Sequence, residues 1–280
     1  MLQWHSPSVM RHRTVWHRTV WNRGISRRSV LSIMLASAIL AAAPVPGFAQ
    51  NVESKPADVA TVDLLLVLAA DISRSVDAAK FKLQRDGYAQ ALTHPRVLEA
   101  IRSASAGRIA ICYLEWSGSN AQSVIVDWTT IGSTEEAQAL AERIRSAPRL
   151  FMERTAIGAA IDFASAQFAR SPFMASRKVI DVSGDGTNNI GREVTAARDQ
   201  ALAQGFTING LAILSEVPLA FNPQHTHPPG GLLKYYEDNV IGGPGAFAIA
   251  ADSHAAFPAS ILNKLIKEIA LGPQQPDLPE

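Results

Sequence analysis

Short apolar runs alternate with longer amphipathic stretches between residues 61 and 271. The first run, residues 62–70, is apolar at nearly every position, which predicts a strand buried on both faces. Residues 77–92 carry apolar or small residues at helical spacing and are predicted to form a helix. The expected buried stripe of that helix comprises Ala79, Leu83, Gly87 and Ala91.

The same alternation continues to the end of the chain. Further strands are predicted over residues 108–116, 123–130, 177–186, 207–214 and 246–251. Further helices are predicted over residues 96–103, 133–146, 154–168, 192–204, 232–238 and 257–271. Residues 215–244 are rich in Pro, Gly and His and predict a long excursion. The pattern indicates a doubly wound, Rossmann-like α/β fold with a mostly parallel central sheet and helices on both faces.

The first 49 residues differ from the rest and predict an export signal. Arg27 and Arg28 precede an apolar run at residues 30–43, which is too short for a comfortable membrane span. The arginine pair fits twin-arginine export, and an ordinary secretory signal fits it as well. We expect a periplasmic or secreted protein without a transmembrane segment in its mature form. The expected divisions are a leader and signal peptide at 1–49, a linker at 50–60, one domain at 61–272 and a disordered tail at 273–280.

Charge is unevenly distributed along the chain. Residues 1–49 hold six Arg and no acidic residue, so the 26 basic residues of the whole chain fall to 20 beyond them, against 25 acidic ones. A remainder of net charge about −5 offers no basic excess to neutralise phosphates, which argues against nucleic acid as a partner. Cys112 is the one cysteine, so no internal disulfide is available, and its apolar surroundings predict an inert buried residue.

Oxygen-bearing side chains follow the first predicted strand. Asp71, Ser73 and Ser75 occupy alternate positions there, and Asp185 lies in a glycine-bounded turn after a later strand. Doubly wound sheets bind ligands beyond the carboxyl ends of their strands, where both segments are expected to lie. Carboxylate and hydroxyl oxygens suit a hard divalent cation.

The order Asp71, Ser73, Ser75, then Thr155, then Asp185 on an alternating α/β chain resembles the von Willebrand factor A domain with its metal-ion-dependent adhesion site. The resemblance spans about residues 61–271. Residues 115–118 and 181–186 also look like an exported bacterial branch of that family, domain of unknown function 1194.

The resemblance implies a ligand set and a mode of binding. Asp71, Ser73 and Ser75 would be ligands from the first loop, Thr155 from the second, and Asp185 the carboxylate of the third. Mg²⁺ suits this set best; Ca²⁺ is less favoured because carboxylates are few, and Mn²⁺ stays open. In the family, an acidic side chain of a partner protein commonly completes the coordination, so an unidentified protein partner is implied.

Each proposed ligand has a structural alternative. Ser75 can cap the helix that follows it, Thr155 can cap another, and Asp185 can be a turn residue. The second loop also departs from the family, because Thr155 lacks the glycines that often precede it and Arg154 would repel a cation unless it points away.

Three further residues are candidates for the surroundings of the site. Glu115 and Trp116 end the second predicted strand, where they either line the rim of the site or pack in the core. Asp181 lies inside a predicted strand and needs a partner if it is buried, so it either supports the site from behind or has a structural role.

Other polar residues are expected to be structural. His225 and His227 resemble a metal-binding pair, but no third ligand has matching spacing, so a solvated loop is the better interpretation. Asn188 and Asn189 are expected to shape the turn after Asp185.

A binding module is the leading functional hypothesis. The sequence has no Ser-His-Asp set, nucleophile elbow or Walker loop, and no His near the proposed ligands in sequence, so the chain is not expected to be an enzyme. The alternatives are a metal-dependent hydrolase that uses the same cation, and a degenerate domain without metal, which the position of Arg154 would favour.

Overall fold

The structure, a computed structural model, describes residues 59–270. The predicted leader and signal peptide, most of the linker and the predicted tail lie outside the described residues. Six strands form one sheet in the order β3-β2-β1-β4-β5-β6. Their bounds are β1 Leu65–Asp71, β2 Ile109–Trp116, β3 Gln122–Ile131, β4 Lys178–Gly184, β5 Thr207–Ile213 and β6 Ala248–Ala251. All neighbouring strands pair in parallel except β2 and β3, which confirms the predicted mostly parallel sheet.

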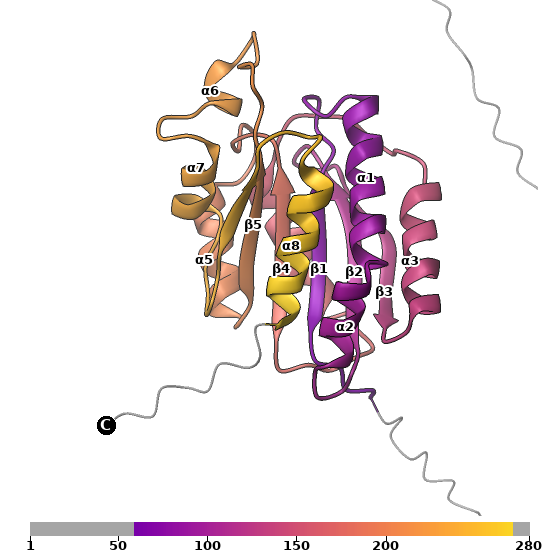
Figure 1. Ribbon diagram of the computed structural model, residues 1–280. Coiled ribbons are helices and arrows are strands. Elements are labelled where there is room, and N and C mark those ends of the chain that lie inside the picture. Colours follow the sequence, from indigo (N-terminus) through magenta and orange to yellow (C-terminus); the bar gives the residue numbers. More distant parts are fainter. Residues whose placement is uncertain (1–58, 271–280) are drawn as a thin grey trace, which may run out of the picture. The chain divides into compact units, whose positions relative to one another are not determined.

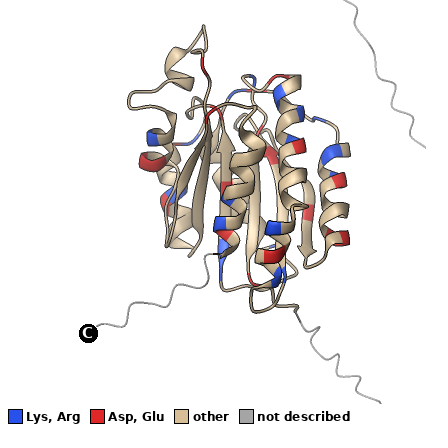
Figure 2. Ribbon diagram, in the orientation of Figure 1, with Lys and Arg blue, Asp and Glu red and all other residues tan. Residues whose placement is uncertain are grey.

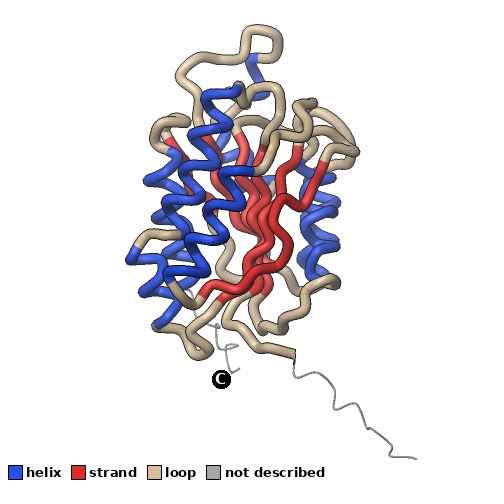
Figure 3. Tube along the Cα trace, turned by 90° about the vertical axis from the view of Figure 1, so that its right-hand side faces the viewer, coloured by secondary structure: helices blue, strands red, loops and turns tan. Residues whose placement is uncertain are grey.

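Helices cover both faces of the sheet, as Figures 1 and 3 show. One face packs against α1 (Ala78–Leu92), α2 (Pro95–Arg102), α3 (Thr134–Ser146) and α8 (Phe257–Ala270). The other packs against α4 (Ile157–Phe168), α5 (Val194–Ala203) and α7 (Leu232–Asn239). The excursion after β5 carries α7 and a short helix, α6 (Pro223–Thr226), which the sequence did not predict.

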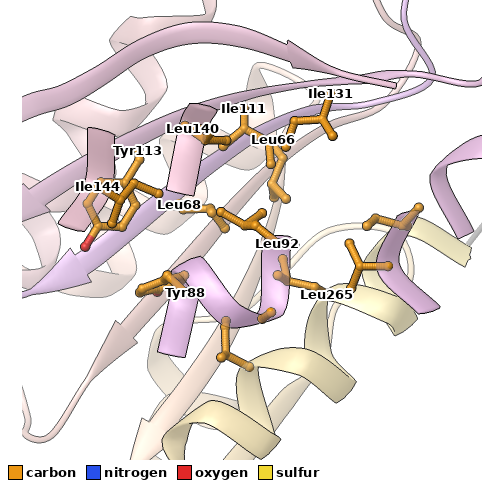
Figure 4. Close-up of a cluster of buried hydrophobic side chains, with 14 of the residues drawn as sticks. Leu66, Leu68, Tyr88, Leu92, Ile111, Tyr113, Ile131, Leu140, Ile144 and Leu265 are labelled. Atoms are coloured by element: carbon orange, nitrogen blue, oxygen red, sulfur yellow. The ribbon is translucent and has the colours of Figure 1, made fainter. Parts of the chain in front are cut away.

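Strand β1 lies at the centre of the sheet and divides its side chains between two cores. Leu66 and Leu68 point into the core shared with α1 and α8, where Leu92 and Leu265 meet them (Figure 4). Leu65, Val67 and Ala69 point into the opposite core with α4 and α5. Every residue of β1 is buried, which explains why its sequence is continuously apolar rather than alternating.

The predicted stripe of α1 is wrong in part. Leu83 is 41% exposed and Ala79 is exposed, whereas Gln84 and Arg85 are buried with Tyr88. The helix is therefore rotated from the position that its apolar residues alone would give. Gln84 and Arg85 can be buried because each has specific hydrogen-bond partners in the loops above the sheet.

Charges of both signs lie together on the solvent side of the helices. Figure 2 shows basic and acidic residues interspersed along α1 and α3. Asp86 of α1, for example, pairs with Lys82 one turn away and with Arg145 of α3. Within residues 59–270, no helix is long and apolar enough to cross a membrane.

Candidate metal centre

The carboxyl ends of β1 and β4 bring the first two candidate carboxylates together. Asp71 is the last residue of β1, and Asp185 directly follows Gly184, the last residue of β4. The two strands are parallel neighbours, with Ala70 opposite Ser183. Both carboxylates therefore lie at the same edge of the sheet, as the sequence predicted from strand ends alone.

A chain of hydrogen bonds joins four of the five predicted ligands. The backbone N–H of Ser73 donates to Asp71 Oδ1 at 2.7 Å, and the Ser73 and Ser75 hydroxyls are 3.1 Å apart. Ser75 Oγ donates to Asp185 Oδ1 at 2.5 Å. The second oxygen of Asp71, Oδ2, is buried and has no hydrogen-bond partner among the described residues. The cluster therefore joins side-chain oxygens of two carboxylates and two hydroxyls, and one carboxylate oxygen is unsatisfied.

Thr155 lies on a neighbouring loop and is buried, whereas Arg154 beside it is exposed. The Thr155 hydroxyl is 3.3 Å from His225 Nε2. Its backbone is held against the Asp185 turn by Asn189, which accepts from Thr155 N at 3.0 Å and donates its own N–H to Thr155 O at 2.9 Å. Asn189 thus does more than shape its own turn, because it joins two of the predicted ligand loops.

The simple capping alternatives do not describe these residues. Asp77, rather than Ser75, caps α1, with its carboxylate accepting from two backbone N–H groups at 2.9 Å. The N-cap of α4 is Ala156, and no side chain caps that helix. The hydroxyls of Ser75 and Thr155 are therefore free to serve the cluster at the strand ends.

Two polar side chains hold the backbone of the Asp71 loop by donating hydrogen bonds to its carbonyls. Gln84 of α1 donates to the Asp71 carbonyl at 3.1 Å. Arg149 donates to the carbonyls of Ile72 at 2.6 Å and Val76 at 2.9 Å. Sequence reasoning missed Arg149 and Gln84, because they act on backbone carbonyls and belong to no motif.

The three candidate surrounding residues are all fully buried. Glu115 forms a bidentate pair with Arg85, at 2.8 and 3.0 Å, and its Oε1 accepts from Tyr113 Oη at 3.2 Å. Trp116 packs in the core, and its carbonyl accepts from Ile72 N at 2.8 Å. Asp181 pairs with Lys264 of α8 at 2.7 Å. Trp116 therefore supports the Asp71 loop through its carbonyl, Glu115 fixes Arg85 of α1, and Asp181 belongs to a buried ion pair.

No His lies near the proposed ligands in sequence, but the fold brings two there, and the predicted solvated loop at His225 is wrong. His225, from the excursion, is only 3% exposed and lies against Thr155, so it does not belong to a solvated loop, although His227 is exposed. His254, in the loop before α8, places Nε2 3.7 Å from Asp185 Oδ2. The strand order could have indicated this position. The excursion begins at the carboxyl end of β5, and β5 is the neighbour of β4, whose carboxyl end carries Asp185.

The excursion also brings Tyr236 to the site through a glycine. A β-carbon on Gly184 would lie 2.6 Å from Tyr236 Oη and 3.0 Å from Asp71 Oδ2, so no side chain fits there. Tyr236 Oη is buried and has no hydrogen-bond partner among the described residues. The absence of a side chain at position 184 therefore lets the phenol and the unsatisfied carboxylate oxygen approach the same space.

Burial and mutual repulsion disfavour negative charge at this edge. Burial raises the pKa of Asp71 well above its ordinary value, and the nearby Asp185 raises it further. Burial also raises the pKa of Tyr236, and the nearby Asp71 raises it further. Burial lowers the pKa values of His225 and His254, an effect that Asp185 opposes. Nothing within residues 59–270 neutralises the two carboxylates by a Lys or Arg ion pair.

The donor set fits a hard divalent cation. Two carboxylates and three hydroxyls come from three loops, and the distances between bonded neighbours, 2.5–3.1 Å, resemble the ~3 Å that separates adjacent ligands around Mg²⁺. Hydroxyls make up most of this set, and the described residues hold no group of three or more His, Cys, Asp or Glu placed to bind a metal. A bound cation would supply the positive charge that the site lacks.

The fold is similar to those of several solved structures. The pilus adhesin SpaC from Lactobacillus rhamnosus GG matches with a TM-score of 0.54 at 16% identity, over 75% of this chain and 31% of that one. Proximal thread matrix protein 1 from the mussel byssus, with its metal-ion-dependent adhesion site occupied by zinc, matches with a TM-score of 0.50 at 13% identity, over 75% and 48%. A von Willebrand factor type A protein from Catenulispora acidiphila matches with a TM-score of 0.45 at 15% identity, over 75% and 42%.

This chain thus spans less than half the length of each of these three proteins. At such low identities the likeness shows the fold alone. No curated protein matches the chain. A family model described as "Protein of unknown function (DUF1194)" matches residues 61–272, most of the sequence, and the chain therefore belongs to that family.

Proposed function

We propose that the chain is an exported von Willebrand factor A-type module that binds a protein partner through a divalent cation. Asp71, Ser73, Ser75, Thr155 and Asp185 would hold the cation, and their oxygens alone favour Mg²⁺. The partner would add a carboxylate at a position that the chain leaves open. Binding rather than catalysis would then be the main task of the site.

One observation carries this proposal: Asp71 Oδ2 is fully buried and has no hydrogen-bond partner within residues 59–270, and a second carboxylate, Asp185, lies nearby. An unpaired buried carboxylate is costly, because desolvation of the charge is not offset by a hydrogen bond or an ion pair. A divalent cation would offset that cost for both carboxylates at once. Arg154, which could have opposed a cation, is exposed.

The loops around the site support a protein as the partner. Most of the large apolar side chains that are exposed within residues 59–270 lie on these loops; the main examples are Leu150, Met152, Val217 and Phe221. Phe221, at the excursion, is 97% exposed. Apolar groups around a charged centre are typical of protein interfaces, where they exclude water from the polar contact. Export is supported by the sequence of residues 1–49, and the module would comprise residues 61–272.

The metal part of the proposal is tested by calorimetry. Metal-stripped protein titrated with Mg²⁺ should bind at one site, and Asp71→Ala should abolish the binding heat. Asp199→Ala, which removes an exposed carboxylate on α5, is the matched control and should bind as the wild type does. Binding that survives in Asp71→Ala would contradict the assignment.

The partner part needs a second measurement. Immobilised wild-type protein should retain a binding protein from periplasmic extract in Mg²⁺ and release it in EDTA, and Asp71→Ala should retain none. A captured protein supports the proposal only if replacing one of its own Asp or Glu residues weakens binding as strongly as Asp71→Ala does. Capture that persists in EDTA would argue against cation-mediated recognition.

A metal-dependent hydrolase is the second candidate, and the two imidazoles favour it. His225 and His254 lie beside proposed ligands, where a general base of a hydrolase would be needed. Metal-dependent turnover of ester or phosphate substrates, lost in Asp71→Ala and in His225→Gln, would establish this function instead.

A further inference from the structure

A cavity of about 650 Å³ lies at the edge of the sheet opposite the proposed cation site. It is bordered by residues 61–63 and 176–177, which precede β1 and β4, and by residues 103–106, which follow α2. The last turn of α8 borders it as well, and Figure 1 shows the end of α8 and helix α2 at this edge. The length of β1 separates the cavity from Asp71 by roughly 20 Å, so the two sites are distinct.

The buried part of the cavity lining is apolar. Val62 and Ile269 are 2% and 5% exposed, and they belong to the two cores on opposite faces of the sheet. Ala100, Ala104 and Ala106 also line the cavity, and their small side chains leave its volume open. Ligand cavities in proteins are typically about 300–1,000 Å³, with apolar walls and a few polar groups that fix orientation. This cavity therefore has the size and the apolar surface for a small molecule.

Asp63, the acidic residue of the lining, already has partners within the chain. Its two carboxylate oxygens accept from the backbone N–H groups of Ala106 at 2.8 Å and Arg108 at 3.2 Å. These bonds fix the loop that forms one wall of the cavity. Asp63 is therefore a structural part of the wall rather than an open binding group.

Arg177, the basic residue of the lining, has hydrogen-bond donors to spare. Its Nη2 donates to the Glu268 carbonyl at 2.6 Å, and its guanidinium forms no other hydrogen bond within residues 59–270. No Asp or Glu in that range forms an ion pair with it. Burial lowers the pKa of Arg177, an effect that Glu268 and Asp63 oppose. A guanidinium carries five N–H donors, so most of those of Arg177 remain available to a ligand.

Arg85 forms a contrast within the same fold. It pairs bidentately with Glu115, and its Nη1 donates to the Ala147 carbonyl. Arg177 is half-buried and has no such carboxylate. A guanidinium that is partly removed from water pairs best with a planar monoanion, and a carboxylate offers two parallel hydrogen bonds to it. The lining therefore combines an apolar surface with one open group for a carboxylate.

We propose that this cavity binds a small amphipathic monocarboxylate, whose carboxylate pairs with Arg177 and whose apolar chain packs on Val62 and Ile269. A single arginine with Asp63 in the same lining favours one negative charge over the two of a phosphate monoester. The inference goes beyond the proposed function and is independent of it, because the cavity shares no residue with the cation site.

Ligand-observed NMR titration of the full-length chain with octanoate, below its micelle concentration, tests the inference. Octanoate should bind at least about 10-fold more tightly than octanol, which lacks the charge, octylammonium, which reverses it, and acetate, which lacks the chain. Arg177→Met keeps an apolar side chain, so it should weaken octanoate binding about 10–100-fold and leave octanol binding unchanged. Arg102→Met removes an exposed arginine directly before the lining loop and is the matched control, which should bind octanoate as the wild type does.

Filling the cavity tests its position directly. Ala104→Phe places a ring in the open volume and should abolish the binding of both octanoate and octanol. Ala106→Phe, on the exposed part of the same wall, repeats the test if Ala104→Phe does not fold. Ala139→Phe, on the exposed face of α3, is the matched control and should bind both probes as the wild type does. Cooperative urea unfolding checks that each variant is folded.

The inference is supported if octanoate binding is lost selectively in Arg177→Met and completely in the filled variants, while both controls bind normally. Equal binding of octanoate and octylammonium, or tighter binding of octyl phosphate than of octanoate, would show that the site does not recognise a monocarboxylate. A wild type that binds no octanoate would also overturn the inference. Sedimentation equilibrium would then show whether a second copy covers the cavity, through self-association that Ala104→Phe abolishes.

Discussion

Two pairs of buried carboxylates each have one member on or just after β4, Asp181 in one pair and Asp185 in the other, and they differ in how their charge is balanced. In the interior, Asp181 and Glu268 share one lysine, Lys264, whose Nζ is 2.7 Å from Asp181 Oδ1 and also contacts Glu268. All three side chains are fully buried. At the sheet edge, Asp71 and Asp185 have hydroxyl and backbone donors, and no Lys or Arg within residues 59–270 forms an ion pair with them.

The difference separates carboxylates that a lysine of the chain balances from carboxylates that the described residues leave without one. Burial penalises both pairs, so each needs positive charge nearby. The interior pair obtains it from α8, which is thereby fixed to the sheet through β4 and β5, since Asn209 also donates to Glu268 at 2.9 Å. The edge pair faces the loops, and no Lys or Arg within residues 59–270 pairs with it. Under the proposed function, a divalent cation would complete it.

The largest effect is expected from Lys264→Met. Removal of the lysine leaves Asp181 and Glu268 buried without a cation, which should lower the free energy of unfolding by about 3–5 kcal/mol. Urea denaturation gives this value directly. Lys234→Met, which breaks an exposed pair with Asp238, is the control and should be nearly as stable as the wild type. If both variants lost the same small free energy of unfolding, Lys264 would not be needed to balance the two buried carboxylates.

The next largest effect is a pH dependence of the stability, caused by Asp181. Burial, and then the neighbouring Glu268, raise the pKa of Asp181 from 3.8 to about 7. Between these values the folded state holds a proton that the unfolded chain has released, so stability falls as pH rises, by at most about 1.4 kcal/mol per pH unit, and levels off above about pH 7. Urea midpoints across this range, with Mg²⁺ present throughout, should decline less steeply in Asp181→Asn. Equal slopes in the two proteins would contradict the raised pKa.

The sequence predicted the fold well because the strands are buried on both faces and leave a continuous apolar signal. It also predicted that Asp71 and Asp185 share an edge, since strand ends and parallel order suffice for that. The identity of the five metal ligands stays a prediction. Their alternative roles as helix caps could be decided only from the structure, where Asp77 takes the cap of α1.

What the sequence did not reveal has a common physical cause. Gln84 and Arg85 lay off the apolar stripe predicted for their helix, and Arg149 belonged to no predicted element, while the partners of all three lie 13 or more residues away along the chain. His225 lies 70 residues from Thr155, and its burial depends on how the excursion folds back over the Asp185 turn. Long-range polar contacts leave no local pattern, and both the support of the Asp71 loop and the burial of His225 depend on them.

The smallest change in stability is expected from Asp71→Asn in EDTA, and it separates the two carboxylate pairs most directly. Asparagine retains an acceptor for Ser73 N but removes the charge that burial and Asp185 disfavour. The free energy of unfolding should stay within about 1 kcal/mol of the wild type or rise, in contrast to Lys264→Met. Added Mg²⁺ should then raise the urea midpoint of the wild type and leave that of the variant unchanged, because a ligand stabilises only the protein that binds it. If Asp71→Asn in EDTA instead lost well over about 1 kcal/mol of unfolding free energy, the charge of Asp71 would already be balanced by other groups of the chain. The reason to expect a cation at this edge would then disappear.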